Sequence, residues 1–142
     1  EEIWTSIRLK SKFNDFFVHD GMIYGLDEGR LTCLELESGR RQWKGDSYGY
    51  GQMLKIGNQL IILSESGEVA LVELDPEDFK EITRFEAIQG KTWNHPAVAH
   101  GKLIVRNDRE MACFDLNLEY SDNENVSDPD NEPIASLALK KE

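Results

Sequence analysis

Three short segments of the sequence combine an aromatic residue with polar residues in a way that would suit ligand binding. They are Phe13-Asn14-Asp15, Tyr50-Gly51-Gln52 and Trp93-Asn94-His95, and each aromatic residue stands eight positions before an expected hairpin turn. An aromatic ring can stack on a flat ligand while amide, carboxylate and imidazole groups form hydrogen bonds. The segments therefore predict a site for a small polar ligand. The alternative is structural, with rings that pack between repeats and polar side chains that cap strand ends.

The other reactive side chains are too dispersed to form a metal centre or a disulfide. His19, His95 and His100 lack the short spacings typical of metal ligands. Cys33 and Cys113 stand in two repeats that are not adjacent, so we expect them to lie too far apart to bond. Both are predicted to be small buried apolar residues. The sequence also contains no nucleophile elbow, Walker loop or dinucleotide fingerprint.

An internal repeat supplies the elements that must position the three segments. Ile23–Leu36, Ile61–Leu74 and Leu103–Leu116 align without gaps, with a period of about 40 residues. The alignment groups residues of similar type at two positions, which are Leu36, Leu74 and Leu116 at one and Cys33, Leu71 and Cys113 at the other. Repeats of this length are typical of helical arrays and of four-stranded propeller blades.

The interior of each repeat favours blades. Apolar runs flank short turns at Asp20-Gly21, Gly57-Asn58 and His100-Gly101, whose residue types suit tight hairpins. No apolar stripe of helical period extends over the residues before the acidic tail. We therefore predict an all-β fold, a partial β-propeller of about three four-stranded antiparallel meanders. Within the repeat region 1–118, the units span about 13–45, 50–87 and 92–116, and an outer strand at 1–10 precedes them.

An aromatic residue recurs in the predicted outer strands. Trp4, Trp43 and Phe85 each stand 15 to 17 residues before the first hairpin turn of the next unit, so we assign them to one repeat position. Burying a large ring between consecutive blades stabilises by about 1.5–3 kcal/mol or more. Recurrence in every blade indicates an architectural role rather than cofactor stacking.

The segment Leu34–Trp43 resembles the tryptophan-docking motif of the PQQ-like (pyrroloquinoline-quinone-type) propeller repeat, with Ser38-Gly39 as the turn. The second repeat departs from that motif, because Asp75–Phe79 replaces the turn and Phe85 replaces the tryptophan. Residues 1–116 are similar to quinoprotein alcohol-dehydrogenase-like and outer-membrane-assembly-lipoprotein-like repeat proteins. The resemblance implies a bacterial protein in the periplasm or outside the cell. It does not fix an activity, since enzymes and non-catalytic scaffolds share the motif.

Two functions are consistent with the resemblance. Quinoprotein dehydrogenases hold their cofactor with a vicinal cysteine disulfide, a tryptophan platform, a metal and an acidic base, and this sequence has no Cys-Cys pair. We therefore expect no cofactor and a non-catalytic module that binds a protein, peptide or carbohydrate partner. The alternative is the C-terminal part of a PQQ-dependent dehydrogenase-like enzyme whose catalytic blades lie outside this chain.

Composition limits the partners. The chain has 142 residues, about one domain, and a net charge of −11, which disfavours nucleic acid and anionic membranes. It shows no run long enough to span a membrane and no signal peptide. Acidic residues gather in the tail 119–142, where Ser121–Pro133 reads as a mobile linker and Ile134–Leu139 as a strand or a short helix.

The number of repeats predicts association. Propellers close with typically 4–8 blades, whereas this sequence supplies about three. Two inter-blade faces would then remain open. We therefore expect a homo-oligomer or association with further blades.

Overall fold

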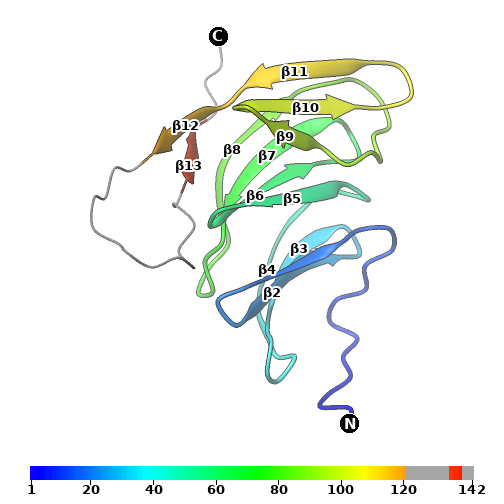
Figure 1. Cartoon of the computed structure of the whole chain (residues 1–142). Coiled ribbons are helices and arrows are strands. Elements are labelled where there is room, and N and C mark those ends of the chain that lie inside the picture. The colour runs from blue at the N-terminus through cyan, green and yellow to red at the C-terminus, as the bar shows by residue number, and fades with distance from the viewer. Residues whose placement is uncertain (121–134, 139–142) are drawn as a thin grey trace.

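The computed structural model describes residues 1–120 and 135–138, and all its regular elements are β-strands. Three antiparallel sheets follow one another along the chain (Figure 1). Blade 1 contains β1 (Phe16–His19), β2 (Met22–Asp27), β3 (Arg30–Glu35) and β4 (Arg41–Ser47); blade 2 contains β5 (Gln52–Ile56), β6 (Gln59–Leu63), β7 (Glu68–Glu73) and β8 (Lys80–Glu86); blade 3 contains β9 (Ala97–Ala99), β10 (Lys102–Arg106) and β11 (Met111–Asp115). The predicted all-β class of successive antiparallel meanders is confirmed.

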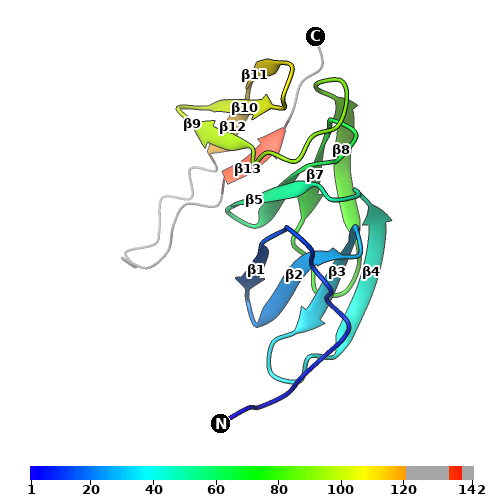
Figure 2. The ribbon, with the colours of Figure 1, turned by 90° about the vertical axis from the view of Figure 1, so that its right-hand side faces the viewer.

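The sheets stack face to face with blade 2 in the middle (Figures 1 and 2). Alternate residues of a strand point to opposite faces, so each face of blade 2 contributes its own set of apolar side chains. One buried layer joins blades 1 and 2 and includes Tyr24, Leu26, Leu31, Cys33, Leu60, Ile62 and Val72. A second layer joins blades 2 and 3 and includes Ile61, Leu63, Val69, Leu71, Leu103 and Val105. Both layers exclude solvent from the centre of blade 2.

Short hairpins set the register of every blade. Asp20 and Gly21 both have positive φ, as do His100 and Gly101, which is the conformation of a type I′ turn. The same backbone bond then closes each meander, from the amides of Leu36, Leu74 and Leu116 to the carbonyls of Gly21, Asn58 and Gly101. The three leucines therefore occupy equivalent positions, as predicted.

The ungapped alignment is wrong by one residue in the second strand of blade 2. Tyr24 lies opposite Cys33 in blade 1, and Ile61 lies opposite Leu71 in blade 2. Because Cys33 and Leu71 are equivalent, Ile61 corresponds to Tyr24 rather than to Ile23. The chain from Ile61 to Leu71 is one residue longer than the chain from Tyr24 to Cys33. The alignment of β6 with β2 therefore shifts by one residue.

Aromatic rings link each outer strand to the next blade. The Trp43 indole donates to the Asp75 carbonyl at 2.9 Å, and its ring lies 5.8 Å from that of Phe79. The Trp4 indole likewise donates to the Leu36 carbonyl at 2.9 Å, and its ring lies against Gly39. Each indole thus bonds a carbonyl 32 residues further along the chain. That carbonyl lies in the bend that follows the third strand of a blade.

Phe85 does not occupy the same position as Trp43, which corrects the sequence assignment. Trp43 lies opposite Cys33, whereas the equivalent Leu71 lies opposite Thr83, two residues before Phe85. The longer loop between β7 and β8 causes this displacement. Phe85 still reaches blade 3, where its ring lies 5.2 Å from that of Phe114 in an edge-to-face pair.

Residues 1–15, which we call the arm, contain no strand. The expected outer strand at 1–10 is therefore not formed. A strand requires a ladder of bonds to a neighbour, and the arm makes isolated contacts instead. The Lys10 amide donates to Asp27 Oδ1 at 2.9 Å, and Leu9 lies against Gly25. The arm therefore lies along blade 1 through Trp4, Leu9 and Lys10.

The chain leaves blade 3 without a fourth strand in the described residues. It continues into β12 (Asn117–Tyr120), which pairs with β13 (Ala135–Ala138) and not with β11. The segment Ile134–Leu139, expected as a strand or a helix, thus contains a strand. The predicted linker Ser121–Pro133 lies outside the described residues. No described helix has the length and apolarity needed to cross a membrane.

Replacing Trp43 tests the contact between blades 1 and 2. We expect Trp43→Ala to lower the free energy of unfolding by about 3–5 kcal/mol, because it leaves a cavity against Tyr24 and Phe79. Trp43→Phe keeps much of the ring and should cost less. Urea denaturation measures both variants, and an alanine variant within about 0.5 kcal/mol of wild type would contradict the assignment.

Candidate functional site

The three predicted segments come together at one end of the blades. The Gln52 side-chain amide donates to the Phe13 carbonyl at 3.0 Å, and that of Asn14 donates to the Gly51 carbonyl. His95 Nε2 lies 3.9 Å from Asp15 Oδ2, so blade 3 also meets the segment before blade 1. We call residues 13–15, 50–52 and 93–95 the rim.

Glu65 joins two parts of the rim, although sequence reasoning missed it. Its Oε1 accepts from the Trp93 indole at 3.0 Å, and its Oε2 accepts from the Tyr50 amide at 3.2 Å. Its backbone is fixed as well, because the Glu65 amide donates to the Tyr48 carbonyl and the Thr92 amide donates to the Glu65 carbonyl. The carboxylate therefore holds an aromatic ring of one segment beside the backbone of another.

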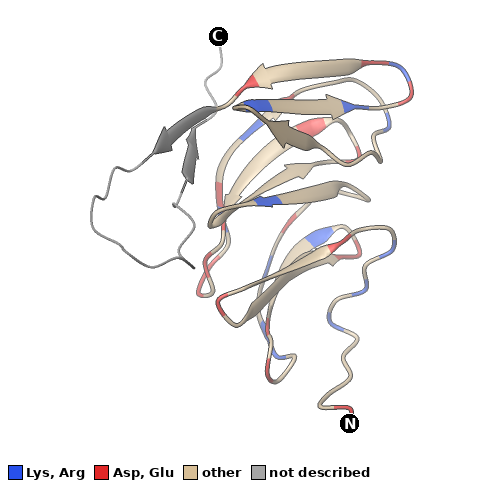
Figure 3. Cartoon of the chain, viewed as in Figure 1, with Lys and Arg blue, Asp and Glu red and all other residues tan. Residues whose placement is uncertain are grey.

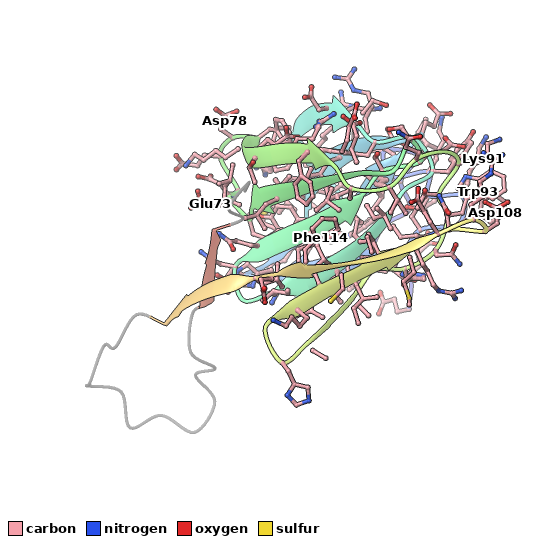
Figure 4. All side chains as sticks on the ribbon, turned by 90° about the horizontal axis from the view of Figure 1, so that it is seen from above. Glu73, Asp78, Lys91, Trp93, Asp108 and Phe114 are labelled. Atoms are coloured by element: carbon pink, nitrogen blue, oxygen red, sulfur yellow. The ribbon has the colours of Figure 1, made fainter. Side chains whose placement is uncertain are left out.

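Two lysines lie over rim aromatics. Lys12 Nζ is 5.1 Å from the Tyr50 ring centroid and donates to the phenol oxygen at 3.0 Å. This hydrogen bond raises the pKa of Lys12, so the ammonium stays charged near neutral pH. Lys91 Nζ lies 4.8 Å from the Trp93 ring centroid. Figure 4 labels both residues, which lie together at one end of the blades. Each pair combines a ring with a fixed positive charge.

The predicted site residues divide into two groups. Phe13 and Trp93 are 78% and 54% exposed, and Asp15 and His95 are exposed beside them. Asn14, Tyr50 and Asn94 are partly buried, and Gln52 is buried. The side-chain amides of Asn14 and Gln52 donate to backbone carbonyls of neighbouring segments. The exposed group is the one that can reach a partner.

Buried polar residues stand at the end of the second strand of each blade. Asp27 is the last residue of β2, and Ser64 and Asn107 directly follow β6 and β10. Ser64 bonds residues of its own hairpin, whereas the other two hold segments that lead to the rim. Asp27 holds Lys10 of the arm, and Asn107 Nδ2 donates to the Gln89 carbonyl at 2.8 Å. Burial alone would raise the pKa of Asp27, but the bonds from Lys44 and the Lys10 amide outweigh it and lower the pKa. Asp27 therefore stays ionised near neutral pH.

A groove of about 520 Å³ adjoins the rim, and its lining includes Tyr48, Glu65, Glu68 and Lys91. The Tyr48 hydroxyl donates to Glu81, and the Arg84 guanidinium lies 4.7 Å from the Tyr48 ring centroid. Burial raises the pKa of Tyr48, so its phenol stays protonated. The groove thus offers hydrogen bonds and charge, and its tyrosine is not available as a base.

The other titratable candidates lie away from this site. His19 faces Asp20 at 3.4 Å, and His100 occupies a hairpin turn. Cys33 is buried, and burial raises its pKa to about 11, whereas Cys113 is exposed rather than buried as predicted. Among the described residues, no group of three or more histidine, cysteine or acidic side chains is arranged to hold a metal ion.

Comparison with known proteins supports the fold. No family model and no curated protein matches the chain. The solved structure of BamB from Moraxella catarrhalis is similar, with a TM-score of 0.50 and 16% identity over 72% of this chain and 33% of that chain. An S. cerevisiae assembly of dbp5, nup159, gle1, IP6 and ADP gives a TM-score of 0.40 and 15% identity over 70% and 28%, respectively.

Together, the stacked sheets and the first of these likenesses define the described region as part of a β-propeller. The chain covers about a third of the length of that solved neighbour. The likeness shows the fold alone.

Removing the Glu65 carboxylate should free the Trp93 ring. In a 1H–15N spectrum, we expect Glu65→Ala to move the Trp93 indole signal, since its hydrogen bond is lost, and to leave those of Trp4 and Trp43 in place. Glu68→Ala is the matched control, because Glu68 lines the same groove and bonds Ser66 instead. An unchanged Trp93 signal in Glu65→Ala would contradict the assigned contact.

Proposed function

We propose that this chain is a non-catalytic part of a β-propeller that binds a protein partner at the rim. The observation that supports this most is the exposure of Phe13, whose backbone carbonyl is held by Gln52, and of Trp93, whose indole is held by Glu65. An exposed ring that is already held in place, as that of Trp93 is, loses little entropy on binding. Aromatic residues of this kind often supply much of the binding energy of an interface.

The chemistry around the rings favours a peptide segment with apolar and acidic side chains. Apolar side chains would cover Phe13 and Trp93, while carboxylates would pair with Lys12 and Lys91. A carbohydrate could also stack on the rings, but it would leave the two ammonium groups without a charged partner. We therefore favour a protein or peptide over a carbohydrate.

We also propose that the module acts without a cofactor, and the tight use of its acidic groups supports this. Glu65 accepts two hydrogen bonds, and Glu81 binds Tyr48 and Arg84. These carboxylates position other residues instead of standing free for acid–base work. The resemblance to PQQ-like repeats supports an extracytoplasmic bacterial setting. We further propose that the chain forms part of a larger ring, either as a homo-oligomer or with further blades. The faces of blades 1 and 3 that no other blade covers support this.

A displayed library of random dodecapeptides tests the rim. We expect selection on the wild-type chain to yield apolar and acidic peptides, and Phe13→Ala or Trp93→Ala to weaken their binding at least about tenfold in fluorescence anisotropy. Phe16→Ala is the matched control, because Phe16 is 58% exposed outside the rim, and it should bind like wild type.

Two results would contradict the proposal. One is that the selected peptides bind the Phe13→Ala/Trp93→Ala double variant as tightly as wild type. The other is dye-linked alcohol oxidation that depends on added pyrroloquinoline quinone and calcium, which would favour the dehydrogenase alternative.

A further inference from the structure

Blade 3 exposes an edge that the other blades cover. The outer strand β4 pairs with β3, and β8 pairs with β7, whereas the described partner of β11 is β10 alone. The face of blade 3 that points away from blade 2 is uncovered as well. Cys33 and Leu71 are fully buried, but the equivalent Cys113 is exposed, and Met111 beside it is 70% exposed. Figure 1 shows β11 at the end of the stack opposite blade 1.

The arm has the contacts of an outer strand but no sheet to join. The Trp4 indole reaches the bend of blade 1 with the same bond length and chain spacing as Trp43 shows on blade 2. Trp43 makes this contact from the outer strand of the preceding blade. The arm therefore lies where the outer strand of a blade before blade 1 would lie. Its Ile3 and Ile7 side chains are 85% and 78% exposed.

We propose that residues 1–10 of a second copy of this chain add to β11 as the missing fourth strand. Trp4 would then lie opposite Cys113, as Trp43 lies opposite Cys33. Because Trp4 stays bound to its own blade 1, the added strand brings that blade onto the open face of blade 3. The new contact repeats the inter-blade geometry that already joins blades 1 and 2.

The number of blades fits this occupant. Two copies that exchange arms reciprocally contain about six blades, within the range at which propellers close. Such an interface is head-to-tail and leaves no blade face uncovered. This inference rests on the proposed role within a ring and is independent of rim binding.

Proline substitutions in the arm test strand addition. We expect multi-angle light scattering to show a wild-type dimer at micromolar concentration and a monomer for Thr5→Pro/Ser6→Pro, because consecutive prolines remove whichever amide faces β11. Thr5→Ala/Ser6→Ala is the matched control and should remain a dimer. The rim variants Phe13→Ala and Trp93→Ala should also keep the dimer mass, so the two proposals can fail separately.

A cysteine cross-link identifies the partner even if the proline variant folds poorly. In a Cys113→Ser background, Ser6→Cys and Met111→Cys lie opposite each other in the proposed register and should form a disulfide between two chains. Pairing Ser6→Cys with Lys102→Cys, on the far side of the sheet, should give no cross-link. A wild-type monomer throughout the micromolar range, or a dimer without the first cross-link, would overturn the inference.

Discussion

Burial of apolar side chains between consecutive blades is the interaction on which the rest of this structure depends. Each sheet has two faces that must be covered, and blade 2 covers one face of each neighbour. Full burial of one leucine or isoleucine side chain contributes about 1.5–3 kcal/mol, so each layer outweighs any single polar contact. The indole of Trp43 adds a hydrogen bond and a ring contact with Phe79 between the first two blades.

The rim follows from this stacking. Charges lie mostly on the turns and outer strands, outside the apolar layers (Figure 3). Buried polar groups at the ends of second strands then hold the connecting segments: Asp27 holds Lys10 of the arm, and Asn107 holds Gln89 between blades 2 and 3. Because these connections carry the rim, its aromatic rings take their positions from the stack. The binding surface that we propose would therefore need no lid and no large internal cavity.

The sequence predicted what local chemistry determines and missed what depends on loop length. Hairpin turns such as Asp20-Gly21 are set by backbone preferences, so the repeats and the all-β class could be predicted. One extra residue between β6 and β7 displaced the alignment of Ile61, and Glu65 in that loop gained its role only through the fold. The arm resembles a strand in sequence, but a strand also needs a paired neighbour, which no sequence pattern supplies.

Native-state hydrogen exchange tests most directly whether the inter-blade layers hold the fold together. β2 and β3 of blade 1 are central strands like β6 and β7 of blade 2, with the same hairpin pairing. They differ because blade 2 has a blade on both faces, whereas blade 1 has one blade and the arm. The account predicts that amides in β6 and β7 exchange more slowly than those in β2 and β3. Equal protection, or slower exchange in β2 and β3, would contradict it.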